Sequence, residues 1–340
     1  TSCPRPGYQR SHKCQPRQKK PMDDPQRIRI GISACLLGEP VRYDGGHKRL
    51  PFATDELSRH FDFIQVCPEQ AIGLGVPRPT IRLVGDPDNP RLQGSKEGPA
   101  LDVTEKMQVF ASDTAAKLQH ISGYIFCAKS PSCGMERVPV VSDSGQGLGK
   151  IGVGVFARKL MEALPLLPVE ENGRLNDVAL RENFVLRVTA YARWQSLQQH
   201  GLTVAQLQEF HRRHKFLLLA HNQALYRELG PLVAETDKQN LDENSQRYIA
   251  LFMRALGKPA SLRNHRNTLM HIQGFFRDHL ESDDRQQLSK VIEDYSNGLL
   301  PLLVPLEMFA MFLKKYHVDY LLDQYYFDPY PRDLKLRVGL

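Results

Sequence analysis

The stretch IRIGISACLLG, residues 28–38, is an apolar, strand-like segment that runs directly into a cysteine. Two further segments repeat this order: residues 63–66 precede CPE at 67–69, and residues 124–128 precede SPSCG at 130–134. Short apolar runs rich in β-branched and aromatic residues are typical of buried strands. Ligands of parallel sheets bind at the carboxyl ends of the strands. We therefore expect the three cysteine segments to meet at one edge of a sheet.

Strand-like and helix-like segments alternate over the first half of the chain. Residues 104–120 and 151–164 are predicted to be helices, and the Gly-rich segment 145–149 between them is predicted to be a flexible loop. Strands separated by helices imply a mostly parallel sheet. The pattern predicts an α/β domain, Rossmann-like with a mostly parallel sheet, over residues 27–168.

The second half of the chain has a helical period almost throughout. A long helix at residues 178–200, within a bridging segment at 169–199, is expected to lead into an all-α domain at residues 200–340. Prolines and acidic residues interrupt the helical period and mark the predicted ends of the helices. Helices are predicted at residues 204–229, 241–256, 260–281, 284–298 and 303–324, before an irregular strap at 325–340.

The basic character of the chain is concentrated at its N-terminus. The net charge is +7, and residues 1–20 hold six basic and no acidic side chains, which leaves +1 (7 − 6) for the rest. A Pro- and Gln-rich arm at residues 1–26 is predicted to be disordered, as either a solvated extension or a phosphate contact, with Cys3 and Cys14 unligated. No segment resembles a signal peptide or a membrane span, so we expect a cytoplasmic protein with reduced cysteines.

Three cysteines at predicted strand ends suggest a metal centre. Soft thiolates select iron–sulfur clusters or zinc, and the paired Cys-x₂₋₄-Cys hooks of structural zinc sites are lacking around Cys35, Cys67 and Cys133, which are separated by 31 and 65 residues. Three thiolates without a fourth suit a [4Fe-4S] cluster with one open iron. The alternative is three ordinary half-buried cysteines. Cys127 belongs to an apolar run and is predicted to be a buried strand residue.

These segments resemble the hallmark motifs of the bacterial thiouracil desulfidase family. The matching motifs are SACLLG at 33–38 with RYDG at 42–45, CPE at 67–69 with GLGVPRP at 73–79, and KSPSCG at 129–134. The resemblance covers about residues 27–168 and implies a [4Fe-4S] cluster held by Cys35, Cys67 and Cys133. It also implies that Glu69 is the acid–base carboxylate and Ser130 an assisting hydroxyl or a turn residue. Four more motif side chains are expected to contact substrate or to hold loops: Arg42, Asp44, Arg78 and Ser132.

The second half resembles the YbgA-like helical domain that is often fused behind the desulfidase domain. The resemblance covers about residues 195–337 and rests on FHRRHKFL at 210–217, SLRNHRN at 261–267 and YYFDPYP at 325–331. Basic side chains at helix starts are suited to phosphates, so this domain is predicted to bind RNA. The alternative to RNA binding is that the charged side chains of these helices are simply exposed to solvent. The candidate RNA contacts are Arg212, Arg213, Lys215, Arg263 and Arg266.

The fused arrangement resembles enzymes that convert 4-thiouridine in tRNA to uridine. The leading hypothesis is therefore a cluster-dependent tRNA 4-thiouridine desulfidase, in which an open iron activates the C=S bond and Glu69 assists the attack of water. One alternative is the same reaction on a free thiouracil base. The other is a non-catalytic iron–sulfur sensor or scaffold.

Overall fold

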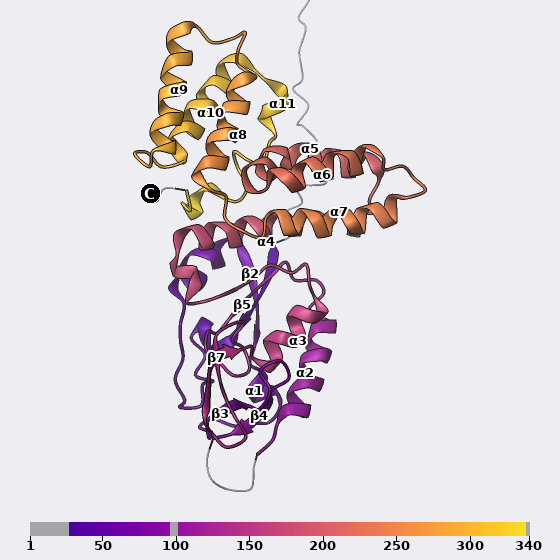
Figure 1. Ribbon diagram of the computed structural model, residues 1–340, viewed down its shortest axis with the longest axis vertical. Helices are drawn as coiled ribbons and strands as arrows, with labels where there is room; N and C mark the ends of the chain where they lie inside the picture. The colour runs from indigo at the N-terminus through magenta and orange to yellow at the C-terminus, as the bar shows by residue number, and fades with distance from the viewer. Residues whose placement is uncertain (1–26, 96–100, 338–340) are drawn as a thin grey trace, which may run out of the picture.

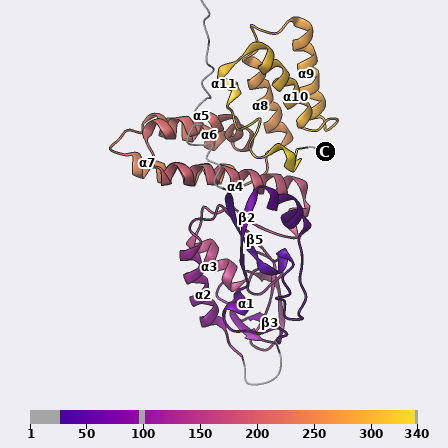
Figure 2. The ribbon, with the colours of Figure 1, turned by 180° about the vertical axis from the view of Figure 1, so that it is seen from behind.

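The computed structural model describes residues 27–95 and 101–337, and the predicted basic arm lies outside these residues. An α/β part and a helical part meet along one long helix, α4 (Val178–Gln199), as Figures 1 and 2 show from opposite sides. Both parts contribute to the same cluster of buried apolar side chains.

Sheet A forms the centre of the α/β part and contains the strands that precede the cysteines. Its order is β2-β1-β5-β8 and all its pairings are parallel, which confirms the predicted class. The last strand lies beyond residue 168, so the α/β part extends past its predicted boundary. The strands span Phe61–Val66 (β2), Ile28–Ser33 (β1), Gly123–Phe126 (β5) and Val169–Glu171 (β8).

Two helices lie side by side against this sheet, α2 (Thr104–Lys117) and α3 (Val155–Ala163) (Figure 1). The helix α2 confirms the segment predicted from helical spacing, and its buried side chains include Met107 and Ala111. A single turn, α1 (Pro68–Ala71), follows β2. Sequential strands joined through helices explain why the carboxyl ends of β2, β1 and β5 lie together.

A second sheet, sheet B, was not predicted. Its order is β4-β3-β6-β7, with one parallel and two antiparallel pairings. The Gly-rich segment predicted to be a flexible loop lies in the hairpin of β6 and β7, so that prediction was wrong. The helix predicted from residue 151 begins at Val155 because β7 occupies its first residues. The strands span Arg91–Gly94 (β4), Ile81–Val84 (β3), Val138–Val141 (β6) and Gly147–Gly152 (β7).

The helical part confirms the predicted period and refines its boundaries. The segment predicted as one helix at 204–229 is two helices that divide at Asn222, whose side chain accepts a hydrogen bond from the backbone N–H of Leu225 at 3.0 Å. The segment predicted at 303–324 divides near His317, which has a left-handed φ of 51°. The helices are α5 (Val204–His221), α6 (Gln223–Ala234), α7 (Leu241–Ala255), α8 (Leu262–Gly274), α9 (Ser282–Ser296), α10 (Leu303–Tyr316) and α11 (Asp319–Leu322).

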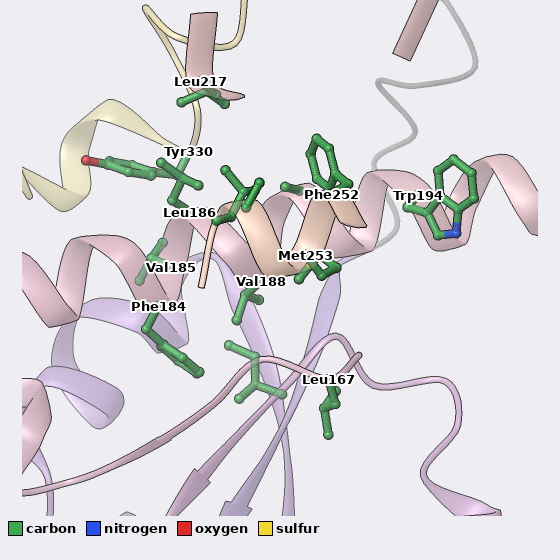
Figure 3. Packing of buried hydrophobic residues seen from close by; sticks show 14 of the residues in the cluster. Leu167, Phe184, Val185, Leu186, Val188, Trp194, Leu217, Phe252, Met253 and Tyr330 are labelled. Atoms are coloured by element: carbon green, nitrogen blue, oxygen red, sulfur yellow. The ribbon is translucent and has the colours of Figure 1, made fainter. Parts of the chain in front are cut away.

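The helix α4 packs against both parts of the molecule. Figure 3 shows Phe184 and Val188 on the side that faces the strands, and Phe252 of α7 on the other side. A Cβ placed on Gly123 at the start of β5 would lie 2.5 Å from Val188, so this glycine lets α4 approach the sheet closely. Farther along α4, the ring of Trp194 lies 5.4 Å from Phe210 of α5.

The helical part contacts sheet A at the edge where the strands begin. His60, just before β2, lies 2.8 Å from Asp333 in the C-terminal segment, and Gln195 of α4 donates to the carbonyl of Ile121, just before β5. The cysteines follow the opposite ends of these strands. Among the residues that the structure describes, no helix combines the length and apolar character needed to cross a membrane.

Candidate functional site

A cavity of ≈ 200 Å³ lies at the carboxyl ends of β2, β1 and β5. Four thiols line this cavity, which we call the sulfur cavity: Cys35, Cys67, Cys127 and Cys133. All four are free of disulfides, and only Cys67 is more than slightly exposed. The structure thus brings the three cysteines that the sequence singled out to one site, at the sheet edge where ligands were expected.

The first two thiols are fixed by short turns that end their strands. Cys35 lies in a tight turn directly after β1, and its carbonyl accepts a hydrogen bond from the backbone of Lys48 at 2.9 Å. Gly38 closes this turn with a φ of 98°, a conformation that favours glycine. Cys67 stands at the N-terminal end of α1, and Pro68 occupies the first helical position, where its missing N–H is not needed.

The Ser130–Gly134 loop, which carries the third thiol, is fastened to the start of α3. The backbone N–H groups of Gly154, Val155 and Ala157 donate to carbonyls of this loop at 2.7, 3.1 and 3.1 Å. Any Cβ on Gly154 would lie 2.5 Å from the backbone carbon and oxygen of Ser132. The loop is therefore held against α3 with no room for a side chain between them.

The predicted catalytic pair, Glu69 and Ser130, lies together within the sulfur cavity. Ser130 Oγ donates to Glu69 Oε1 at 3.4 Å, and Cys67 Sγ lies 3.6 Å from Glu69 Oε2. Ser130 Oγ also accepts from the backbone N–H groups of Ser132 and Cys133 at 3.2 and 3.1 Å. Since its lone pairs receive these two bonds, the hydroxyl proton of Ser130 is directed to the carboxylate. The residue thus has both a turn role and a contact with Glu69.

Burial and mutual repulsion raise the pKa values of the three candidate ligands. Burial raises the pKa of Cys67 to about 11, with a further contribution from Glu69. The pKa of Cys133 is well above its ordinary value, first because of burial and then because of Glu69 and Cys127. A side-chain hydrogen bond with Cys127 and then burial raise the pKa of Cys35. A positively charged group bound among these sulfurs would relieve this penalty.

The donor set of the cavity fits an iron–sulfur cluster. Three sulfurs from three chain segments are the ligands that such clusters use. The buried hydroxyl of Ser132, in the loop that carries Cys133, has no hydrogen-bond partner among the described residues, so a donor is left for a sulfur-rich group. Within residues 27–95 and 101–337, no three Cys, His, Asp or Glu side chains are grouped so as to hold a metal ion by themselves.

Two of the four predicted substrate contacts line the cavity. Arg42 and Arg78 do, and Arg78 also donates to the carbonyls of Val41 and Gly75 at 3.0 and 3.2 Å. Asp44 is exposed outside the cavity, where it accepts from the backbone of Gly46 at 3.0 Å. Ser132 is fully buried behind the loop rather than in the lining.

Sequence reasoning missed two cavity residues. Cys127 is buried, as predicted, but its thiol lines the cavity beside Cys35. The available signal was its place as the first residue after β5. Lys48 also lines the cavity, where its charge, after the hydrogen bond with Cys35, lowers the pKa of Cys127. The signal for Lys48 was its proximity to the RYDG motif at 42–45.

The five predicted RNA contacts lie in different surroundings. Arg212 pairs with Glu209 at 2.7 Å and with Asp323, and Arg213 is buried with its guanidinium 4.1 Å from the ring centre of Tyr325. These two arginines therefore bind other parts of the protein. Lys215 is half-buried over aromatic rings. Arg263 and Arg266, at the start of α8, are exposed and form no ion pair within the described part of the chain.

Comparison with known proteins assigns a family to each half. Residues 30–172 match the family described as 2-thiouracil desulfurase, and residues 215–331 match a family described as a protein of unknown function, DUF1722. The uncharacterized protein YbgA of Escherichia coli (strain K12) is 40% identical over 157 residues, which are 46% of this chain and 93% of YbgA. The solved structure of the [4Fe-4S]-dependent thiouracil desulfidase TudS covers 47% of this chain and 100% of its own, with 28% identity and a TM-score of 0.35. The chain belongs to the YbgA family and carries, ahead of its YbgA-like helical part, a domain of the 2-thiouracil desulfurase family.

Proposed function

We propose that this protein is a [4Fe-4S]-dependent desulfidase that converts 4-thiouridine in tRNA to uridine and releases sulfide. The observation that carries the proposal is that three thiols and the Glu69–Ser130 pair share one cavity. The reaction exchanges the sulfur of a C=S group for the oxygen of water, with sulfide as the second product. It needs no oxidant or reductant. The match of residues 30–172 to the 2-thiouracil desulfurase family supports the same chemistry.

Each cavity residue has a role in this proposal. Cys35, Cys67 and Cys133 would hold the cluster, which supplies a soft Lewis acid for the sulfur of the substrate when bound. Glu69 takes a proton from the attacking water and returns it to the departing sulfur. Ser130 holds the carboxylate in place through the hydrogen bond that its hydroxyl donates. Because Cys67 is two residues from Glu69, the base lies beside the metal site.

The arrangement of cations favours a substrate that carries phosphate. Arg42, Lys48, Arg78 and Lys129 all line the sulfur cavity. Phosphates are bound by such Arg and Lys side chains, whereas a free base offers no anionic group of this kind. A base in folded RNA has to be turned out of its stack to enter a cavity of this size.

The helical part lies too far from the cavity to contact a free base. It contacts the starting edge of sheet A, and the strands of about 6 residues rise roughly 20 Å to the cavity edge. A ligand that touches both the cavity and Arg263 or Arg266 must therefore be much larger than a nucleoside. A folded RNA has the size to reach both places, and a free base does not.

The direct test is anaerobic reconstitution followed by an assay of sulfide release. The loaded protein should show iron–sulfur absorption and should release sulfide from 4-thiouridine-containing tRNA. Glu69→Gln should keep the iron content and lower turnover by roughly 10²–10⁴-fold, as expected for loss of a general base. Glu105→Gln, an exposed position on α2, is the matched control. Full activity of Glu69→Gln would rule out Glu69 as the general base, whereas a loaded wild type that releases no sulfide would favour the sensor or scaffold alternative.

The choice between tRNA and free base has its own test. Arg263→Glu combined with Arg266→Glu should raise KM for thiolated tRNA roughly tenfold, because repulsion of phosphates replaces attraction. The rate on free 4-thiouracil should not change. Lys106→Glu combined with Lys117→Glu, at two exposed positions on α2, changes the net charge by the same amount and serves as the control. Equal KM values for tRNA in all three proteins, with faster turnover of the free base, would support free thiouracil as the substrate.

A further inference from the structure

Tyr43 is an exposed aromatic residue at the sulfur cavity that the proposed chemistry does not use. It is 43% exposed and lies in the RYDG motif at residues 42–45. Of the residues that line the cavity in the described part of the chain, it is the only aromatic one. The reactive end of the cavity consists of thiols, a carboxylate and a hydroxyl, none of which has a flat aromatic face. The ring of Tyr43 is therefore the one aromatic face that the lining can offer to a ligand.

The backbone on both sides of Tyr43 holds this residue in place. The N–H of Gly45 donates to the carbonyl of Arg42 at 3.0 Å, and the N–H of Arg42 donates to the carbonyl of Gly46 at 3.2 Å, so the residue lies in a tight turn. The carbonyl of Tyr43 accepts from the N–H of Arg78 at 2.9 Å, which ties the turn to a second segment of the cavity lining. An exposed side chain on a backbone that is already fixed loses less entropy when a ligand binds to it.

A cation accompanies the ring. The guanidinium of Arg42 lies over the Tyr43 ring, 5.7 Å from its centre, and Arg42 also lines the cavity. Two consecutive residues thus bring an aromatic ring and a positive charge to the same cavity. Proteins that bind unstacked nucleotides use this pair of groups, because the ring stacks on the base while the cation attracts the phosphate.

The chemistry of the cavity leaves the faces of a bound base without a partner other than this ring. The C=S group has to reach the thiols and Glu69, so the polar contacts of the base lie along its edge. A base that is turned out of folded RNA also loses the stacking on its two faces. Sites that accept such a base replace the lost stacking with aromatic or apolar side chains.

We propose that Tyr43 is a substrate-binding residue whose ring stacks on the planar ring of the thiolated base while the C=S group faces the thiols. The inference rests on the proposed function and narrows its substrate class. The site should select aromatic pyrimidine thiones over saturated thioamides that carry the same C=S group, because only a planar aromatic ring stacks well.

The test measures the binding of 4-thiouracil and of its ring-saturated dihydro form, which keeps the C=S group without an aromatic ring. Both ligands are bound anaerobically to cluster-loaded Glu69→Gln, in which turnover is slow, and Kd is measured by equilibrium dialysis. Adding Tyr43→Ala should raise Kd for 4-thiouracil roughly 5–150-fold, the range for loss of one base stacked on an aromatic side chain. Kd for the dihydro form should change much less. Tyr43→Phe keeps the ring and should restore the binding of 4-thiouracil.

Leu148→Ala is the matched control, because Leu148 is also 43% exposed, on β7, and does not line the cavity. It should leave both Kd values unchanged. Unchanged binding of 4-thiouracil in Tyr43→Ala, or an equal loss for both ligands, would overturn the inference. The proposed function would still stand in that case if the loaded wild type releases sulfide from thiolated tRNA. A loaded wild type that releases no sulfide would overturn the proposed function and the inference with it.

Discussion

Replacement of Gly154 by alanine should displace the Ser130–Gly134 loop and lower the amount of iron that the sulfur cavity binds. The backbone of Gly154, with φ of −58° and ψ of 141°, is open to alanine, so any effect must be steric. The new Cβ would lie 2.5 Å from the backbone carbon and oxygen of Ser132 and 2.9 Å from the nitrogen of Cys133. Ordinary contact begins at 3.4 Å, so the loop has to move by about 0.9 Å (3.4 − 2.5).

This movement has a cost that the contacts of the loop define. Three backbone hydrogen bonds join the loop to the start of α3, and each contributes about 1 kcal/mol. Overpacking adds about 1–3 kcal/mol, so a loss of roughly 4–6 kcal/mol is expected for the α/β part when all three bonds break. At about 2–4 °C per kcal/mol, the melting temperature should fall by roughly 8–24 °C. A displacement near 1 Å also lowers activity by roughly 10²-fold, because Ser130 and Cys133 move together.

The assay is thermal unfolding followed by circular dichroism, with iron content measured on the same samples. The control is Gly230→Ala in α6, where an added Cβ meets nothing within 4 Å. That substitution should stabilise the protein by roughly 0.5–1 kcal/mol, since alanine favours a helix over glycine. If Gly154→Ala melts with the wild type and holds as much iron, the close contact does not govern the loop.

Three further outcomes follow from the same structure. Glu182→Ala should lower the free energy of unfolding by about 3–5 kcal/mol, since it leaves the buried guanidinium of Arg337 without the carboxylate that lies 2.7 Å away. The control Glu307→Ala removes an exposed ion pair and should cost less than about 1 kcal/mol in the same thermal unfolding experiment. Burial raises the pKa of Glu171 to about 7 from 4.5, so the folded state holds this proton more tightly. Stability should therefore fall by about 2 kcal/mol as pH rises from 4.5 through 7, and Glu171→Gln should flatten that slope in urea titrations. Iron analysis should show that alanine substitution of Cys35, Cys67 or Cys133 removes the cluster and that Cys127→Ala retains it. Loss of iron in Cys127→Ala, with retention in one of the other three variants, would make Cys127 a ligand in place of that cysteine.

The part of the fold that sequence could predict is the part with local patterns. The apolar run before Cys35 and the run before Cys67 are continuous, so both strands and the parallel sheet followed from them. The helical period of α4 and α7 extends over 15 residues or more and gave their bounds to within a residue. The meeting of three cysteine segments followed from the single rule that parallel strands end at one edge.

The remaining features depend on contacts between distant residues. Each strand of sheet B except β7 has only 4 residues, too few to establish a period, and β3 pairs with strands both near and far along the chain. The burial of Arg213 depends on Tyr325, more than a hundred residues away. The place of Cys127 in the cavity depends on the turn that brings Cys35 back toward β5.

The sharing of α4 between the two parts has a consequence for the order of folding. While the chain is being synthesised, the α/β part can lay Phe184 and Val188 of α4 on sheet A, but Trp194 lacks the packing of Phe210 and Tyr248 until α7 is complete. Until then, a helix that packs against the α/β part exposes a large apolar surface on its other side. A chain cut short after α4 keeps that surface exposed. A destabilising substitution in the helical half should thus also destabilise the α/β part that holds the sulfur cavity, even when the substituted residue does not contact the cavity.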